Sequence, residues 1–174
     1  GAGSCWTQRG SINIGLRAQY NSFTVQDGAN FWGSEGLSLG YESLNNSVTI
    51  RGTGTTWSIA TWMQMGSYGG SNSLEVADGA QAVFGGGIEV NNGWVSVAGS
   101  GAVLRLGGFS CWTGGAARVS GGAFCGVSGE SHFDPRLLEV TGAGSVWSNG
   151  DVFAVANYAD GGRVRIADGG RAIC

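Results

Sequence analysis

The sequence predicts an all-β chain that folds as a parallel β-helix, a triangular β-solenoid of about seven coils with 21–26 residues per coil. A first observation is the module Gly-x-Gly-(Ser/Thr)-x-Trp, which occurs at residues 1–6, 52–57 and 142–147. A second is that apolar residues follow each of these Trp residues at +6, +8, +17 and +19, and Asp-Gly follows at +21 and +22. Identical spacing in three places indicates a repeating backbone, which is the signature of a solenoid.

Each coil is expected to contain three strands, in chain order. The first carries one large apolar residue, in a column made of Trp6, Phe31, Trp57, Phe84, Leu104 and Trp147. The second carries apolar-x-apolar pairs, in a column made of Ile12/Ile14, Leu37/Leu39, Met63/Met65, Ile88/Val90, Phe109/Cys111, Ser131/Phe133 and Phe153/Val155. The third carries a further column of pairs, made of Phe23/Val25, Val48/Ile50, Leu74/Val76, Val95/Val97, Ala117/Val119, Leu138/Val140 and Val164/Ile166. Apolar residues at every second position are typical of a strand with one buried face.

The columns predict which residues fill the core and how the domain is organised. The predicted core stack comprises Trp6, Trp57, Trp147, Val25, Ile50, Val76, Val97, Val119, Val140 and Ile166. Because the repeat leaves no linker, residues 1–174 are predicted to form a single β-solenoid domain, with an irregular middle at 98–136 where the copies are weaker. A β-sandwich is the alternative fold, but a sandwich has no reason to keep one register through three modules.

The amino-acid composition restricts the kinds of partner that the chain is expected to bind. The chain has 35 Gly among 174 residues, which suits tight corners, and its 42% hydrophobic content indicates a packed core. Charge is sparse, with nine Arg, no Lys, twelve acidic residues and a net charge of −3. A weakly acidic rod without basic clusters argues against nucleic acid as a partner. No apolar run is long enough to span a bilayer, so we expect no membrane insertion.

The four cysteines lack the C-x-x-C spacing of a metal site, and the chain has one His. An even count in a strand-rich chain without Lys favours disulfides, and Cys111–Cys125 is the candidate intra-chain pair. The alternative is that all four are small buried hydrophobes. Cys5 and Cys174 are expected in the first column at opposite ends of the rod, too distant to bond within one chain, which makes them a candidate inter-subunit disulfide.

The two ends point towards assembly. The chain starts with a full-strength copy of the module and ends in mid-pattern, so neither end has the polar cap that solenoids use to cover an open strand edge. We expect either a segment of a longer rod or subunits that cap one another by polymerising.

The expected outward side chains do not form a reactive constellation. Arg118, Glu139 and Arg165 are expected one layer apart with alternating sign, which makes a stabilising ladder. Asp27 and Asp78 share a phase of the repeat but are expected about 10 Å apart, too far to share one ion. We therefore predict no catalytic, cofactor-binding or metal-binding residues, no cofactor and no enzymatic activity.

The tryptophans divide into two groups. Trp6, Trp57 and Trp147 hold one phase of the repeat and are expected in the core, whereas Trp32, Trp62, Trp94 and Trp112 lie off that phase. Exposed members of the second group could stack on sugars or on neighbouring rods, because an exposed aromatic stripe marks an interface more often than chance.

The module at residues 140–155, Val-Thr-Gly-Ala-Gly-Ser-Val-Trp-Ser-Asn-Gly-Asp-Val-Phe-Ala-Val, continued by residues 162–170, resembles the autotransporter-type β-strand repeat of large bacterial surface proteins. The resemblance covers residues 1–97 and 137–174 well. It implies an exported β-helix passenger at the cell surface, of a kind that mostly acts as an adhesin or scaffold. The chain departs from that family in having four cysteines and no translocator barrel, which favours a stand-alone secreted subunit.

The sequence thus predicts a non-catalytic extracellular structural protein, located outside the cell or on a bacterial cell surface. As a β-solenoid subunit, it would assemble with copies of itself into a filament or surface layer. The alternative is an adhesin or carbohydrate-binding passenger fragment that takes surface glycans as partners. A remote alternative is a polysaccharide lyase-like enzyme.

Overall fold

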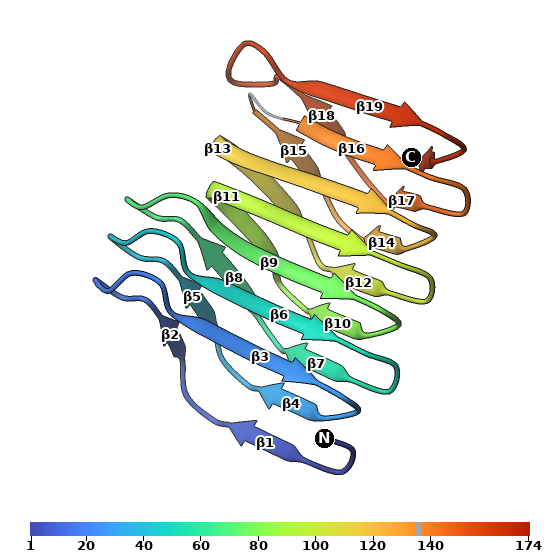
Figure 1. Ribbon diagram of the computed structural model, residues 1–174. Helices are drawn as coiled ribbons and strands as arrows, with labels where there is room; N and C mark the ends of the chain where they lie inside the picture. Colours follow the sequence, from blue (N-terminus) through green and yellow to red (C-terminus); the bar gives the residue numbers. More distant parts are fainter. Residues whose placement is uncertain (135–136) are drawn as a thin grey trace.

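The chain is a three-sided parallel β-solenoid of about seven coils (Figure 1). The structure is a computed structural model that describes residues 1–134 and 137–174. Within those residues every pairing between strands is parallel, and no helix occurs. We name the three sides face A, face B and face C in the order in which the chain reaches them.

Face A is an eight-stranded sheet, and faces B and C together form a twelve-stranded one. Face A consists of β1 Cys5–Gln8, β4 Asn30–Gly33, β7 Thr56–Ile59, β10 Gln81–Phe84, β12 Val103–Leu106, β14 Phe124–Val127, β17 Val146–Asn149 and β20 Arg171–Ile173. Face B contains β2 Ile12–Ile14, β5 Leu37–Leu39, β8 Trp62–Met65, β15 Ser131–Phe133 and β18 Phe153–Val155. Face C contains β3 Ser22–Gln26, β6 Ser47–Arg51, β9 Asn72–Ala77, β16 Leu137–Thr141 and β19 Arg163–Ala167. Two long strands, β11 Gly87–Ala98 and β13 Phe109–Ser120, pass from face B into face C without a break.

The predicted columns of faces B and C are confirmed residue by residue. On face B, Ile12 pairs with Leu37, and Leu37 with Met63; the same register continues to Phe153. On face C the register runs from Phe23 through Val48 to Val164. Period-two apolar pairs therefore locate both the strands and their alignment.

The predicted column of face A is wrong in one coil. Trp57 pairs with Ala82, and Phe84 lies two residues further along the strand, opposite Ile59 and Leu106. The column then runs through Leu104 to Cys125, which lies directly below Trp147. The small residues Ala82 beside Trp57 and Cys125 beside Trp147 let neighbouring layers fit together at normal packing density.

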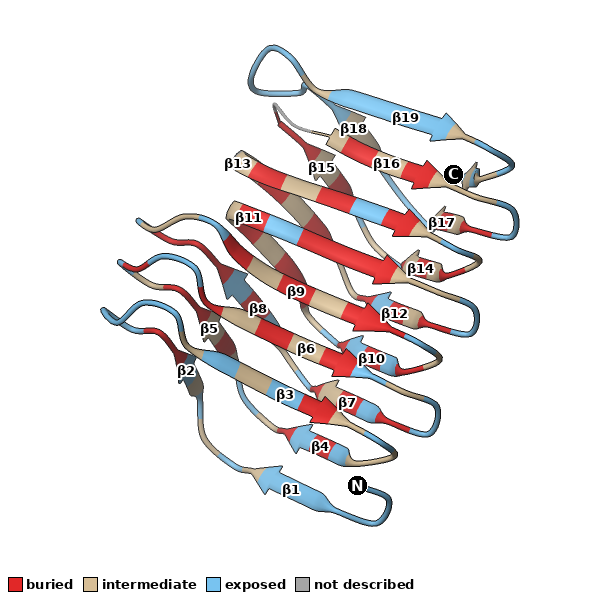
Figure 2. Cartoon of the chain, in the orientation of Figure 1, coloured by how far each residue is buried: buried red, intermediate tan, exposed pale blue. Residues whose placement is uncertain are grey.

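Most of the predicted core stack is buried, because coils on both sides cover it (Figure 2). Trp57 and Trp147 are each 1% exposed, and the face-C residues from Val25 to Val140 are buried as well. The prediction is wrong for Trp6 and Ile166, which are 53% and 49% exposed. Both occupy the core phase of a predicted column. They lie in the first and last coils, however, where no further coil of the chain packs on them.

The largest change in coil length occurs where face B turns into face C. In coils 1, 2, 3 and 7 a corner loop makes this turn, at residues 15–21, 40–46, 66–71 and 156–162. In coils 4 and 5 the strands β11 and β13 run through the same corner without a loop. Face-A partners are accordingly 25 residues apart at Cys5 and Asn30 but 22 apart at Gln81 and Val103. The middle at 98–136 is therefore shorter, and the irregularity within its described residues is a register shift of one residue in β13, between Cys111 and Gly114.

An asparagine ladder supports the first three corner loops. Asn21 Nδ2 donates to Asn46 Oδ1 at 2.9 Å, and Asn46 Nδ2 donates to Asn72 Oδ1 at 3.1 Å. Asn46 and Asn72 are fully buried, so these bonds satisfy polar groups that would otherwise destabilise the core. The ladder ends where Gly93 of β11 takes the place opposite Asn72.

The Gly-x-Gly-(Ser/Thr) module builds the corner between faces C and A. Thr55 Oγ1 accepts a hydrogen bond from the N–H of Gly28 in the preceding coil, at 3.0 Å, and donates to the Arg51 carbonyl at 2.8 Å. Ser145 makes the equivalent bonds to Gly122 and Thr141. The module therefore ties adjacent coils together at the corner.

Candidate binding surface

Exposed aromatic side chains gather on face B and at its corner with face C. All four tyrosines of the chain, Tyr20, Tyr41, Tyr68 and Tyr158, lie in the B–C corner loops. On face B itself Trp62 is 57% exposed, and Trp112 is partly exposed. The other two tryptophans that lie off the core phase are exposed elsewhere, Trp32 on face A and Trp94 on face C.

Trp62, Trp112 and Tyr158 border a hollow of about 320 Å³ on face B, which we call the face-B groove. Its lining includes Trp62, Gly108, Trp112, Glu130, His132 and Tyr158. Trp62 belongs to coil 3 and Glu130 to coil 6, so three layers separate them, or about 14 Å at the spacing of paired strands. Between them Gly86 and Gly108 contribute no side chain, and the backbone forms the floor.

A β-bulge positions Trp112. Val90 of β11 pairs with Cys111 of β13, but Asn92 pairs with Gly114, so β13 holds one extra residue at this point. Bulges redirect a side chain away from the regular alternation of the strand. The Trp112 ring lies parallel to His132, with centroids 6.4 Å apart, and tilted against Tyr158 at 6.0 Å. The three rings form one continuous aromatic surface at the groove.

The tyrosine loops are held in place by specific contacts and unusual backbone conformations. The Tyr158 N–H donates to Oδ1 of the buried Asp134 at 3.0 Å, which anchors the last corner loop against the body of the solenoid. Tyr20 and Tyr68 adopt positive φ angles of 61° and 57° while remaining 77% and 86% exposed. Bulky residues rarely adopt this conformation, and such strain concentrates at functional sites.

Polar side chains accompany the aromatic ones. The strand pairing on face B brings Gln64, Glu89, Ser110 and His132 into adjacent layers. His132 Nε2 lies 3.0 Å from Glu130 Oε2, and that carboxylate is largely exposed. Glu89 accepts hydrogen bonds from Asn91 and Gln64. The groove thus offers a carboxylate, a hydroxyl and an imidazole beside its aromatic walls.

The internal cysteines occupy core positions on different faces. Cys111 lies on face B between Val90 and Phe133, and Cys125 lies on face A between Leu104 and Trp147. Both are buried, and no disulfide is formed, so the candidate pair Cys111–Cys125 is not supported. Burial raises the pKa of the Cys125 thiol, which keeps it protonated and chemically inert. The interpretation of these two residues as small hydrophobes fits better.

The two terminal cysteines do not share one column. The face-A register carries the position of Cys5 to Arg171, three residues before Cys174. The error follows from counting against Phe84, which lies out of phase with Trp57. An end-to-end contact that continued this register would separate the two Cα atoms by about 10 Å, beyond the reach of a disulfide. The candidate inter-subunit bond Cys5–Cys174 is therefore not compatible with in-register stacking.

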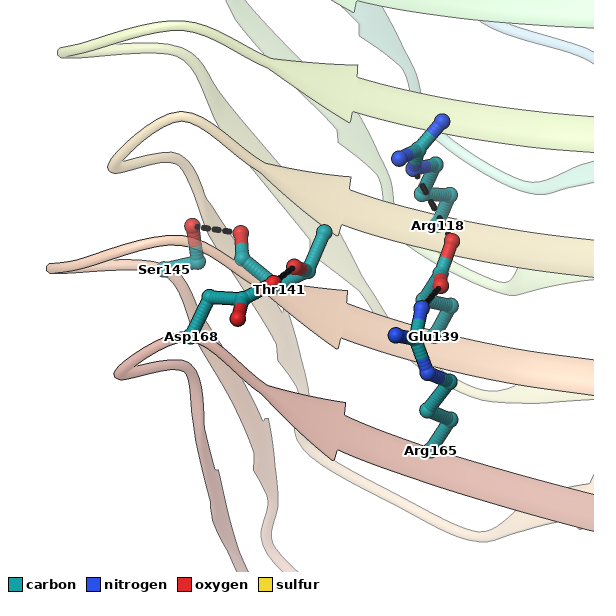
Figure 3. Close-up of polar contacts among 6 residues, drawn as sticks. All are labelled: Arg118, Glu139, Thr141, Ser145, Arg165 and Asp168. Carbon is teal, nitrogen blue, oxygen red and sulfur yellow. Dashed lines mark hydrogen bonds and ion pairs between the residues drawn. The ribbon is translucent and has the colours of Figure 1, made fainter.

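The predicted charge ladder on face C is confirmed (Figure 3). Arg118 Nε lies 3.1 Å from Glu139 Oε2, and Arg165 pairs with the other oxygen of the same carboxylate. Nearby, Thr141 donates to Asp168 at 2.9 Å, which joins the last two coils at their corner. These acidic groups are thus engaged in contacts between coils.

Replacing Glu139 by Gln should lower the free energy of unfolding by about 0.5–1 kcal/mol, because opposite charges on neighbouring strands stabilise a sheet to that extent. Urea denaturation at low and high salt measures the effect, and salt should reduce the difference between the two proteins. Glu75→Gln on β9 is the matched control on the same face, since Glu75 pairs with Thr49 and Ser96 instead. Equal losses in the two variants would contradict an ionic role for the ladder.

The aspartates of the repeat serve as turn residues. Asp27, Asp78 and Asp168 have positive φ angles of 58°, 54° and 51°, and each precedes a glycine that also has positive φ. Asp and Gly accept this conformation at tight corners. Among residues 1–134 and 137–174, no group of three or more His, Cys, Asp or Glu could hold a metal ion.

Comparisons of the chain with protein-family models, with curated proteins and with solved structures find no match. None of the described residues belongs to a helix of the length and hydropathy needed to cross a membrane. The class of the protein therefore rests on its own fold, a parallel β-solenoid.

Sequence reasoning identified part of the face-B groove. It singled out Trp62 and Trp112 as lying off the core phase, and the predicted pair Ser131/Phe133 places His132 between two inward positions. It did not identify Tyr158 or Glu130, or the glycine floor between them. The clustering of all four tyrosines in the segments between columns was a usable signal, because corner loops carry exposed side chains.

Proposed function

We propose that the chain is a non-catalytic structural β-solenoid of an extracellular or bacterial cell-surface protein, and that its copies associate end to end. The observation that carries this proposal is the state of the two end coils. Val155, Val164 and Ile166 at one end, and Trp6 at the other, are core-phase residues that remain 37–53% exposed. Apolar surface beside unpaired strand edges associates readily with further strands.

A second copy is the occupant that best matches these ends. At one end β2 and β3 present Ile12/Ile14 and Phe23/Val25, and at the other β18 and β19 present Phe153/Val155 and Val164/Ile166. The two ends thus continue the same columns. Stacking β2 and β3 of one copy on β18 and β19 of another would extend both columns and pair both edges.

Face A imposes a condition on this contact. The chain contributes β1 to the first coil and β20 to the coil beyond the seventh. When faces B and C are paired as above, β1 of one copy and β20 of the other would occupy the same place, so the contact forms only when one of these two strands detaches from its coil. Removing residues 170–174 should therefore strengthen the association, because it clears that place for β1.

Sedimentation velocity over a range of protein concentrations, together with negative-stain electron microscopy, tests the proposal. The chain should form rods that lengthen with concentration and are indifferent to reductant. Ile166→Arg should yield monomers, since a charge on the exposed end column opposes stacking, whereas Thr24→Arg, which points outward from β3, should behave like the parent chain. Monomers at every concentration would contradict the proposal. Rods that dissolve on reduction would show that a disulfide joins the copies, and the in-register contact would then be wrong.

A further inference from the structure

We propose that the face-B groove is a binding site for a neutral oligosaccharide. This activity goes beyond the structural role and does not depend on self-association. The groove combines a length of about three strand layers with an aromatic wall and a row of polar side chains. A groove with these features is complementary to an elongated ligand that has apolar faces and hydroxyl groups along its edges.

The aromatic wall supplies the apolar contact. Trp112, His132 and Tyr158 lie with centroids 6.0–6.4 Å apart and form a surface that a pyranose ring can cover with its C–H face. Trp62 provides a second aromatic contact at the opposite end of the groove. Rings distributed along a groove, rather than around one point, suit a chain of sugar rings better than a compact quaternary ammonium group, which needs an enclosing cage.

The polar row supplies the hydrogen bonds that fix a ligand's orientation. Glu130 is largely exposed and has acceptor capacity left after its contact with His132. The Ser110 hydroxyl lines the same groove, and Gln64 and Glu89 continue the row beyond it. A few polar groups beside an apolar surface are typical of small-molecule sites.

The negative charge in and beside the face-B groove disfavours anionic ligands. The groove lining includes Glu130 and contains neither Arg nor Lys, and Glu89 lies one layer from Ser110. Phosphate or sulfate groups would meet carboxylates there without a cation to balance them. We therefore assign the ligand to uncharged glycans rather than to nucleic acid or sulfated polysaccharides.

The corner loops extend the same surface. Tyr41 and Tyr68, with ring centroids 5.7 Å apart, border a second hollow of about 580 Å³ that also contains Gln64, Glu89 and Asn91. Glu89 lines this second hollow and pairs with Ser110, which lines the face-B groove, so the two hollows are neighbours on one face. A longer oligosaccharide would reach from the face-B groove to these tyrosines.

Saturation-transfer NMR and isothermal titration calorimetry with cellotetraose, chitotetraose and maltotetraose test the proposal. The Ile166→Arg background separates binding from self-association; if that variant still associates, the end-contact proposal fails while the binding result stands. At least one oligosaccharide should bind at millimolar or lower concentration. Trp112→Ala and Tyr158→Ala should each weaken binding about tenfold. Trp94→Ala, an exposed tryptophan on face C, is the matched control and should leave binding unchanged.

A second kind of variant fills the groove without removing an aromatic ring. An added Cβ at Gly108 would have its nearest neighbour at 3.5 Å, so Gly108→Leu should fold, occupy the floor and abolish binding. Circular dichroism checks the fold of each variant. The proposal is overturned if no oligosaccharide binds, or if Gly108→Leu and Trp112→Ala bind like the parent chain. Binding of choline or a heparin hexasaccharide in place of the three sugars would also overturn it.

Discussion

Replacing Trp57 by alanine should lower the free energy of unfolding by about 3–5 kcal/mol, the usual cost of deleting a large buried aromatic side chain. Trp57 is 1% exposed and occupies the centre of the face-A column in coil 3. Its ring stacks on Phe31 with centroids 4.2 Å apart, and it meets Phe23 edge-on at 5.5 Å. In the next coil its partner is Ala82, which cannot fill the space that the indole leaves.

Urea denaturation followed by far-UV circular dichroism measures this loss. Trp32→Ala is the matched control, because Trp32 lies in the adjacent strand β4 but points outward and is 44% exposed. Its replacement should change stability by no more than about 0.5 kcal/mol. Since each coil contacts only its neighbours, hydrogen exchange should show the effect of Trp57→Ala first in coils 2 to 4. Similar losses in the two variants would contradict the packing described for face A.

The columns of faces B and C could be predicted to the residue because two independent signals agree there. Apolar residues at every second position define the strand, and a second pair at a fixed distance defines its alignment. The predicted face-A column takes a single large residue from each strand, so a large side chain in a neighbouring position misleads. In coil 4 the bulk of Phe84 conceals the true partner of Trp57, which is the small residue Ala82.

The binding surface was less predictable because it depends on the geometry between columns. Trp112 joins the groove through a bulge of one residue, and a single sequence does not reveal which residue of a strand is the extra one. Tyr158 is 26 residues from His132 in the chain, yet its loop places the two rings 6.4 Å apart. Only the register of whole coils brings such residues to one face.

The same corner geometry predicts a large loss of stability from the addition of a single methyl group. Gly93 lies in β11 where that strand passes through the B–C corner, and its φ angle is 144°. A Cβ added there would lie 2.2 Å from the carbonyl oxygen of Asn72 and 2.9 Å from Met65 Sδ. Gly93→Ala should therefore lower the free energy of unfolding by about 3 kcal/mol or more, since backbone strain and a steric clash act together.

Gly36→Ala is the matched control for this prediction. Gly36 has an ordinary φ angle, and an added Cβ would meet its nearest atom, the Trp62 carbonyl oxygen, at 3.5 Å. This substitution should be neutral or stabilise the fold by up to about 1 kcal/mol, because alanine restricts the unfolded chain. Thermal and urea denaturation of both variants provide the comparison. A Gly93→Ala protein as stable as the Gly36→Ala protein would show that β11 does not follow this tight path, and that coil 4 turns its corner in another way.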